Sequence, residues 1–188
     1  TGNSAEMIRM LRPGGGVALL GQPRAAGDSL SQTVLADWID PAPITVTAKL
    51  SDDENGVWAF VVRKPVDGAG EWSHLYGRAD NSAFGGETLG GVSTATGMRV
   101  KWIGRPGPRA QPDRNGRKPS PLSVNGRLFV QGLHRLIGLD AHNGTPLWSL
   151  EIPSMERFNM PRDCGNWCAD DDTVFAAIRD KCWQIDAQ

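Results

Sequence analysis

Three cysteines near the end of the chain have the clearest chemical potential: Cys164, Cys168 and Cys182. Thiolates bind zinc, but the spacing is not that of a Cys-x-x-Cys pair and no histidine is close in sequence. The strands predicted below place Cys168 and Cys182 on the first and third strands of one sheet. They would then lie roughly 9–10 Å apart, too far for a direct disulfide. We interpret the cysteines as packed thiols, with a disulfide between two of them as the alternative in an exported protein.

Two short runs could bind ions. Asp170-Asp171-Asp172 offers carboxylates to calcium, but it falls between two predicted strands, so we interpret it as a solvated hairpin turn. Gly14-Gly15-Gly16 has the composition of a phosphate-binding loop. It lacks the Lys-Ser/Thr ending and precedes a strand instead of a helix, so we interpret it as a structural turn.

Basic residues gather between positions 99 and 118, against the single acid Asp113. Such a segment could bind a polyanion, but only Trp102 offers a stacking surface, so the nucleic-acid signal is weak. We favour a solvated loop. The basic residues are Arg99, Lys101, Arg105, Arg109, Arg114, Arg117 and Lys118.

The chain has three histidines, in unrelated sequence contexts. His74, His134 and His142 form no triad and no metal spacing. The sequon Asn143-Gly144-Thr145 coincides with a predicted turn and is interpreted as that turn. The sequence therefore predicts no catalytic residue and no metal ligand, and it identifies no cofactor-binding residue.

Composition limits the class of protein. The chain has 188 residues, 39% hydrophobic and 22% charged, with a formal net charge of −1, as in ordinary globular proteins. No global charge points to nucleic acid or to a membrane surface. No apolar stretch reaches the roughly 18 residues of a membrane span. Thr1 is not an initiator Met and no leader pattern follows, from which we expect a processed or internal piece.

Residues 1–65 alternate helix and strand signals. Ser4–Leu11 predicts the end of a helix, and Gly16–Leu20 predicts a strand buried on both faces. A second helix, capped by Asp28 or Ser29, runs through Ile39. Two strands, Ile44–Leu50 and Val57–Arg63, then surround an Asn-Gly turn. This order suits the last third of an α/β domain, and residues 66–70 are a linker.

Residues 71–188 repeat with a period of 46. Phe129 and Phe175 are 46 residues apart, and so are Asp140 and Asp186. A weaker upstream copy aligns Trp102 with Trp148, again 46 residues apart, and Gly97 with Gly144. A period in the forties filled with short strands predicts β-propeller blades.

One blade is complete, at about residues 119–150. Its predicted strands are Leu122–Val124, Arg127–Gly132, Leu136–Asp140 and Thr145–Ser149, joined by Asn-Gly turns. The next copy contains Asn166–Ala169, Thr173–Arg179 and Cys182–Asp186. The fold class we expect is thus mixed, an α/β end followed by an incomplete all-β propeller.

The second region resembles the pyrroloquinoline-quinone-like (PQQ-like) propeller family, also called quinoprotein dehydrogenase-like. The resemblance rests on Leu139–Trp148, which follows the blade pattern Ala-x-Asp-x-x-Thr-Gly-x-x-x-Trp with Asp and Ala transposed. It implies that Asp140 caps a turn, that Gly144 takes a positive φ, and that Trp148 packs between blades. Asn143 belongs to the same motif. Trp102 and Gly97 are the counterparts of Trp148 and Gly144 in the upstream copy, and Asp186 is the counterpart of Asp140 in the downstream copy. Trp72–Gly77 resembles the segment that opens such propellers.

The resemblance does not imply the quinone. Quinoprotein dehydrogenases hold PQQ at the axis of a closed ring with calcium and a disulfide between adjacent cysteines, and no two cysteines here are adjacent. We therefore expect no PQQ cofactor here, because the family name describes a fold and not an activity. The resemblance also implies a periplasmic or extracytoplasmic location.

The first region resembles the C-terminal end of a class I S-adenosylmethionine (SAM) methyltransferase. Glu6–Gly15 is similar to the helix and Leu-Arg-Pro-Gly-Gly turn before that fold's fifth strand. SAM is then a cofactor for a full-length protein, although its Gly-rich loop would lie upstream.

Three functions follow from these resemblances. The first is a binding scaffold whose propeller loops meet a protein or small-molecule partner. The second is a SAM-dependent methyltransferase with the propeller as recruiting module. The third is a quinone-dependent dehydrogenase.

Overall fold

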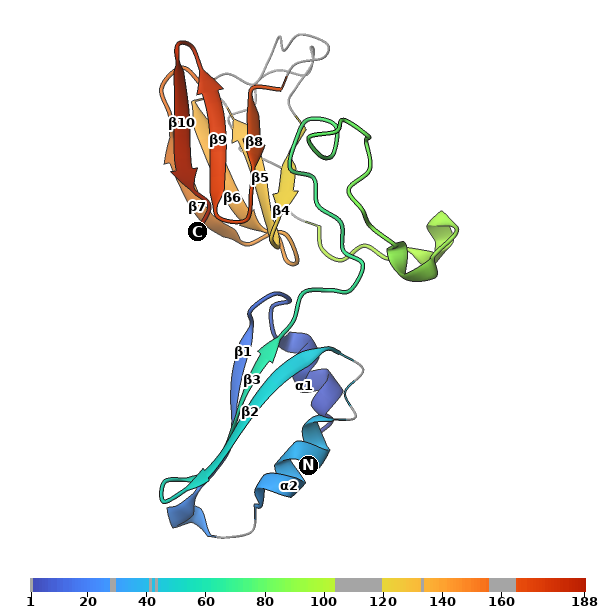
Figure 1. Ribbon diagram of the computed structural model, residues 1–188, viewed down its shortest axis with the longest axis vertical. Coiled ribbons are helices and arrows are strands. Elements are labelled where there is room, and N and C mark those ends of the chain that lie inside the picture. Colours follow the sequence, from blue (N-terminus) through green and yellow to red (C-terminus); the bar gives the residue numbers. More distant parts are fainter. Residues whose placement is uncertain are drawn as a thin grey trace. The chain divides into compact units, whose positions relative to one another are not determined.

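The chain divides into two compact units, Thr1–Asp67 and Gly68–Gln188. A computed structural model describes residues 2–27, 30–40, 42, 44–103, 120–132, 134–155 and 165–188. Each unit is described by itself (Figure 1).

The described residues of the first unit form two short helices and three strands. Its elements in chain order are α1 (Ser4–Met10), β1 (Val17–Pro23), a 3-10 turn (Arg24–Ala26), α2 (Gln32–Ile39), β2 (Val46–Asp53) and β3 (Gly56–Arg63). Side chains cap both helices, because the first helical N–H groups have no partner inside the helix. Asn3 accepts a hydrogen bond from the Ala5 N–H, and Ser31 accepts one from the Val34 N–H. Ser31 is the cap in place of Asp28 or Ser29, which lie outside the described residues.

The three strands form one sheet in the order β1-β3-β2. Strand β3 pairs antiparallel with both neighbours, and the register aligns Leu19, Phe60 and Lys49 across the sheet. Residues that alternate along a strand point to opposite faces. One face of β3 carries the buried side chains Val57, Ala59 and Val61, and these pack with Ile8, Leu35 and Ile39 of the helices.

This sheet corrects the predicted α/β end. Every strand pairing in the first unit is antiparallel, and no Rossmann-like α/β domain is evident among the described residues. The hairpin of β2 and β3 explains the difference, because β3 lies between β1 and β2 and pairs with both. Helix and strand order alone left that arrangement open.

The predicted burial of β1 is also wrong. Along β1, exposed and half-buried positions alternate, and Leu19 is 64% exposed. The helices contribute to a core on one face only, so the apolar residues on the other face of β1 stay in contact with solvent.

The described residues of the second unit contain two antiparallel sheets. Repeat sheet 1 has the order β4-β5-β6-β7, and repeat sheet 2 has the order β8-β9-β10. The strands are β4 (Leu122–Val124), β5 (Arg127–Gly132), β6 (Arg135–Asp140), β7 (Pro146–Glu151), β8 (Trp167–Ala169), β9 (Thr173–Ile178) and β10 (Lys181–Asp186). Two further 3-10 turns, Leu89–Gly91 and Ala95–Gly97, lie upstream.

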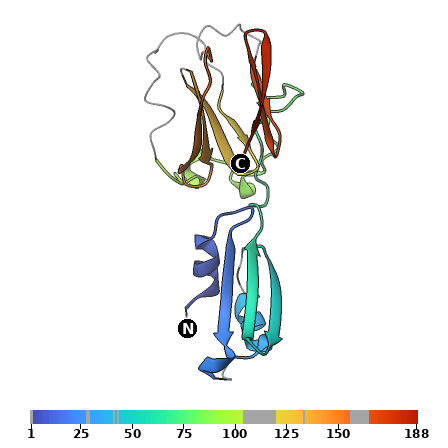
Figure 2. The same cartoon turned by 90° about the vertical axis from the view of Figure 1, so that its left-hand side faces the viewer.

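The two repeat sheets pack face to face around one core (Figure 2). Repeat sheet 1 contributes Leu122, Phe129 and Leu136, all fully buried, and repeat sheet 2 contributes Val174 and Ala176. Burying apolar area at about 25 cal/mol per Å² is the main stabilising term of such a core. Each sheet therefore buries one apolar face of the other sheet.

The 46-residue period appears in the hydrogen bonds as well as in the strands. The Ala141 N–H donates to the Gly126 carbonyl, and 46 residues later the Ala187 N–H donates to the Asp172 carbonyl. Asn125 and Asp171, which are also 46 residues apart, meet directly, since the Asn125 side chain donates to the Asp171 carbonyl at 3.2 Å.

The sheets do not form the predicted propeller. The described strands make one four-stranded sheet and one three-stranded sheet, and no ring is closed. The local pattern predicted strands and turns, but closure of a ring depends on how many sheets pack and in which direction. The mixed fold class is therefore replaced by a mostly β architecture of three small antiparallel sheets.

The segment around Trp72 joins the two repeat sheets. Trp72 exchanges two backbone hydrogen bonds with Ser123 of β4, at 2.7 and 2.8 Å. The neighbouring Ser73 carbonyl accepts a bond from the Ala169 N–H of β8 at 3.0 Å. Ser123 and Ala169 are equivalent in the repeat, so this segment lies across the first strands of both sheets.

Candidate functional site

Two tryptophans of the motif make the same contact in successive repeats. The Trp102 indole N–H donates to the Ala141 carbonyl at 2.9 Å, and the Trp148 indole N–H donates to the Ala187 carbonyl at 3.2 Å. The Trp148 ring also lies 5.9 Å from the Phe129 ring, centroid to centroid. Each indole thus joins its own repeat to the next one, through packing and one hydrogen bond.

The polar motif residues stabilise turns. Asp140 is buried, and its carboxylate accepts a hydrogen bond from the His142 N–H at 2.8 Å. Asp186 accepts the equivalent bond from the Gln188 N–H, also at 2.8 Å. The Asn143 side chain accepts from the Thr145 N–H at 2.8 Å. These are Asx-type turns, in which a side-chain oxygen replaces a backbone acceptor.

The two motif glycines differ. Gly144 has φ of +75°, and a Cβ there would lie 2.5 Å from the Trp102 ring. Gly97 closes a 3-10 turn, and its φ is not positive. The alignment of Gly97 with Gly144 therefore does not extend to the backbone conformation.

Among the described residues, one side of repeat sheet 2 packs on repeat sheet 1, and its other side carries an apolar surface that is open to solvent. This outer face includes Cys168, Phe175, Ala177 and Cys182, which the register places on one side of the sheet together with the polar Gln184. The equivalent residues of repeat sheet 1 include Leu122, Phe129 and Leu136, all buried under repeat sheet 2. In repeat sheet 2 the same positions are half-buried or exposed.

A hollow of about 400 Å³ opens on this outer face. Segment 74–81 forms part of its wall with His74, Leu75 and Asn81, and the His74 Nδ1 lies 2.9 Å from the Ser73 hydroxyl. The remaining lining residues are Gly165, Asn166, Trp167, Cys168, Phe175, Ala177 and Cys182. The lining is mainly apolar with a few polar groups, which is the general character of a binding site.

Cys168 and Cys182 are free thiols on the first and third strands of repeat sheet 2, with β9 between them. Burial raises the pKa of the Cys168 thiol, and nearby Cys182 and Asp170 raise it further. Cys164 lies outside the described residues. Within the described part of the chain, no three His, Cys, Asp or Glu side chains gather as a metal site.

The acidic run forms the turn between β8 and β9. The Asp170 carboxylate accepts hydrogen bonds from the backbone N–H groups of Asp172 and Thr173, at 3.0 and 2.7 Å. A hollow of about 560 Å³ beside this turn is lined by all three aspartates and by Glu71. The Glu71 carboxylate accepts from the Asn125 N–H at 3.3 Å, so it also serves the turn of the neighbouring sheet.

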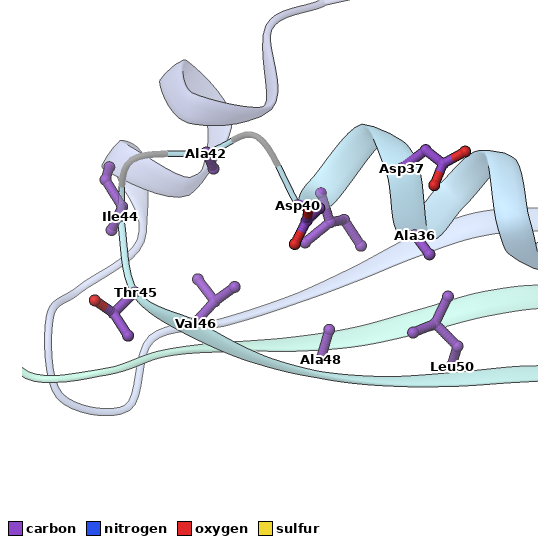
Figure 3. Close-up of a pocket in the computed structure, with 10 residues that line it drawn as sticks. Ala36, Asp37, Asp40, Ala42, Ile44, Thr45, Val46, Ala48 and Leu50 are labelled. Carbon is purple, nitrogen blue, oxygen red and sulfur yellow. The ribbon is translucent and has the colours of Figure 1, made fainter.

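The first unit has a groove of about 480 Å³ between α2 and β2 (Figure 3). Val46, Ala48 and Leu50 point from β2 toward the helix, and Asp37 and Asp40 lie at the helix end. No basic residue occupies the last turn of α2 to offset the negative end of the helix dipole.

The remaining candidates stay apart from these hollows. Gly14, Gly15 and Gly16 form a turn, in which their N–H groups donate to the carbonyls of Lys64, Arg63 and Arg12. His134 and His142 line none of the hollows described above. Of the basic segment, Arg99, Lys101 and Trp102 are described, whereas residues 105–118 lie outside the described residues.

Sequence reasoning missed the hollow on repeat sheet 2. The only available signal was the substitution of Leu122 and Leu136 by Cys168 and Cys182 at equivalent positions. This smaller, more polar pair lies on the face of repeat sheet 2 that the described residues leave exposed or half-buried.

Comparisons with family models, with curated proteins and with solved structures gave no match for this chain. None of the described helices combines the length and the apolar character that a bilayer crossing requires.

Proposed function

We propose that the second unit, Gly68–Gln188, is a scaffold that binds another polypeptide through the outer face of repeat sheet 2. We further propose that it is related to the PQQ-like repeat family. The repeated indole-to-carbonyl contact supports that kinship, because a residue type, a spacing and a hydrogen bond recur together.

One observation carries the binding role. Among the described residues, the outer face of repeat sheet 2 is open and hollowed, whereas its counterpart in repeat sheet 1 is buried core. Apolar surface has a lower free energy when it is buried than when it is in water. A partner with a complementary surface would therefore bind favourably by covering this sheet face. Phe175 is equivalent to Phe129 and supplies an aromatic anchor of the kind that dominates binding energy.

The role is tested with a displayed library of twelve-residue peptides, selected against the full chain. Ala177→Arg places a long charged side chain in the hollow, at a position that is already exposed. Leu147→Arg, at an exposed position on β7, is the matched control. We expect the selected peptides to lose at least tenfold in affinity for Ala177→Arg and to bind Leu147→Arg unchanged. A selection without enriched peptides, or peptides indifferent to Ala177→Arg, would refute the proposal.

A further inference from the structure

The groove of the first unit runs beside an edge strand of its sheet. In the order β1-β3-β2, strand β2 pairs with β3 on one side, and no other described strand pairs with its second side. The described residues that line the groove all come from residues 36–50, which include the second half of α2 and the first half of β2. We call this feature the α2–β2 groove. Its two walls are therefore neighbours in the chain as well as in space.

The backbone groups of β2 alternate between β3 and the open side. The Lys64 N–H donates to the Thr45 carbonyl at 3.0 Å, so Thr45 is one of the residues that bond toward β3. In an antiparallel pair, alternate residues direct both their N–H and their C=O groups to the same side. Val46, Ala48 and Leu50 therefore direct these groups to the open side of β2.

The same three residues of β2 supply the apolar wall of the α2–β2 groove. Their side chains point from β2 toward α2 (Figure 3). A strand added to β2 would send the side chain opposite Ala48 to this same face, because directly opposite residues share a face of the sheet. Each added residue that hydrogen bonds to β2 would thus also place its side chain in the groove. The volume of about 480 Å³ is within the range of ligand sites.

Strand β2 lacks the usual protection of a sheet edge. Edge strands are commonly short, or carry a bulge, a proline or a lysine that prevents pairing with another chain. Strand β2 has eight residues without proline, and its register with β3 is continuous from Val46 to Asp53. Its single lysine, Lys49, alternates with Ala48 and Leu50 and therefore lies on the face opposite the groove. An additional strand can pair with such an edge.

Acidic residues specify the charge of the occupant. Asp37 and Asp40 line the α2–β2 groove, and none of the described lining residues is basic. Asp40 is the C-cap of α2, at the negative end of the helix dipole. A short connection joins Asp40 to Val46, so this negative end lies beside the beginning of β2. A basic side chain is favoured at that end of the groove.

We propose that the α2–β2 groove binds an extended basic segment of another polypeptide, which pairs with β2 as an antiparallel strand. The segment places apolar side chains opposite Leu50 and Ala48, and a lysine or arginine opposite Val46 beside Asp40. Main-chain hydrogen bonds supply affinity, and the groove positions supply specificity. This site belongs to the first unit and goes beyond the role proposed for the second unit.

The test uses a seven-residue peptide and the full chain. The peptide has valine at its second and fourth positions, lysine at its sixth and threonine elsewhere, with a fluorophore at its N-terminus and an amidated C-terminus. Binding is measured by fluorescence anisotropy. N-methylation of the fourth residue, whose N–H faces Ala48, should weaken binding at least fivefold, because it removes a hydrogen bond to the edge. N-methylation of the third residue, whose N–H faces away from β2, should have little effect.

Protein variants at Ala48 test the edge from the other side. Ala48→Pro removes an N–H that faces the open side and leaves the bonds to β3 intact, which is the position where an edge strand tolerates proline. We expect it to weaken binding at least fivefold. Ala48→Ser keeps the N–H and is the matched control, which should bind the peptide as the parent chain does. Circular dichroism checks that both variants are folded.

The charge preference has its own comparison. A peptide with glutamate in place of lysine should bind about two- to fivefold more weakly, as expected for exposed charges. The double variant Asp37→Asn and Asp40→Asn should remove this difference. Glu54→Gln, at an exposed position in the turn between β2 and β3, is the control and should retain it.

The outcomes separate this inference from the proposed function. Absence of peptide binding to the folded parent chain would overturn the inference, and so would binding that is indifferent to the position of N-methylation. Ala177→Arg in the second unit should leave binding of this peptide unchanged, and a loss would assign the peptide to repeat sheet 2. A chain that is dimeric without peptide and becomes monomeric with Ala48→Pro would assign the edge to a second copy and likewise overturn the inference.

Discussion

The indole N–H of Trp148 donates a hydrogen bond to the carbonyl oxygen of Ala187, 39 residues further along the chain, at 3.2 Å. Trp102 and Ala141 make the same contact over the same separation. Because each bond joins two repeats, it stabilises the packing of one repeat against the next more than it stabilises any single strand.

Trp148→Phe should remove this hydrogen bond while keeping an aromatic ring beside Phe129. We expect the free energy of unfolding of the second unit to fall by about 1 kcal/mol, the typical net worth of one hydrogen bond. Urea denaturation followed by circular dichroism measures the change. Trp183→Phe, at the exposed edge, is the control and should stay within about 0.5 kcal/mol of the parent chain. Equal losses for both variants would contradict the assigned role of Trp148.

Gly138→Ala should crowd the same indole. The added Cβ would lie 2.5 Å from the Trp148 ring, and overpacking of this kind costs about 1–3 kcal/mol. Trp148→Ala removes the ring and with it the clash. The double variant should therefore be more stable than the sum of the single losses predicts, by at least about 1 kcal/mol. Strict additivity in the same denaturation experiment would show that the two residues do not interact.

Gly144→Ala should destabilise the turn in two ways. The position has φ of +75°, which costs an L-residue about 1–2 kcal/mol, and its Cβ would meet the Trp102 ring. Gly90 offers a matched control, since it has φ of +57° with open space around its Cβ position. We expect the melting temperature to fall further for Gly144→Ala than for Gly90→Ala. Similar shifts would indicate that backbone strain alone accounts for both.

Substitution by lysine should affect stability very differently at the neighbouring residues Leu19 and Leu20 of β1. Leu19 is 64% exposed, whereas Leu20 packs against the core of the first unit. Leu19→Lys should change the free energy of unfolding by less than about 0.5 kcal/mol and reduce aggregation measured by light scattering. Leu20→Lys should cost at least about 2 kcal/mol, because it places a charge against apolar side chains. Reversal of this order would contradict the observed faces of the sheet.

The Cys168 thiol should make stability depend on alkaline pH. Its pKa is raised in the folded chain, first by burial and then by Cys182 and Asp170, so the folded state holds this proton more tightly than the unfolded state. The contribution is complete below the ordinary thiol pKa of 9.0 and is lost as pH rises above it toward the folded value. Cys168→Ser should flatten this part of the pH profile in urea titrations. An unchanged slope would show that the thiol ionises equally in both states.

Cys182 and Cys168 should also differ in reaction with iodoacetamide. The thiolate is the reactive form, and Cys182 is exposed whereas Cys168 is half-buried with a raised pKa. We expect peptide-resolved mass spectrometry to find alkylation of Cys182 first at pH 8. Faster labelling of Cys168 would contradict the environment described for it.

Local features of this chain could be read from its sequence. The strands β2 to β10 fall close to their predicted ranges, because alternating apolar residues and Asn-Gly turns act over a few neighbours. The 46-residue period was equally visible, since equivalent residues in repeated units meet equivalent surroundings. The kinship and the partner-binding role that this period suggests stay predictions.

Only the tertiary structure decided which faces are covered. Leu19 and Leu20 look alike in sequence, yet just one packs against the core, because the helices contribute to it on one side of β1 only. The incomplete propeller expected from the repeat and the α/β end expected from element order were both wrong, since pairing depends on segments far apart in the chain. Leu136 and Cys182 likewise occupy equivalent places, but Leu136 is buried under repeat sheet 2, whereas Cys182 is exposed. The sequence determined the strands and their repeat, and the contacts between distant strands decided which side chains are buried and which are exposed.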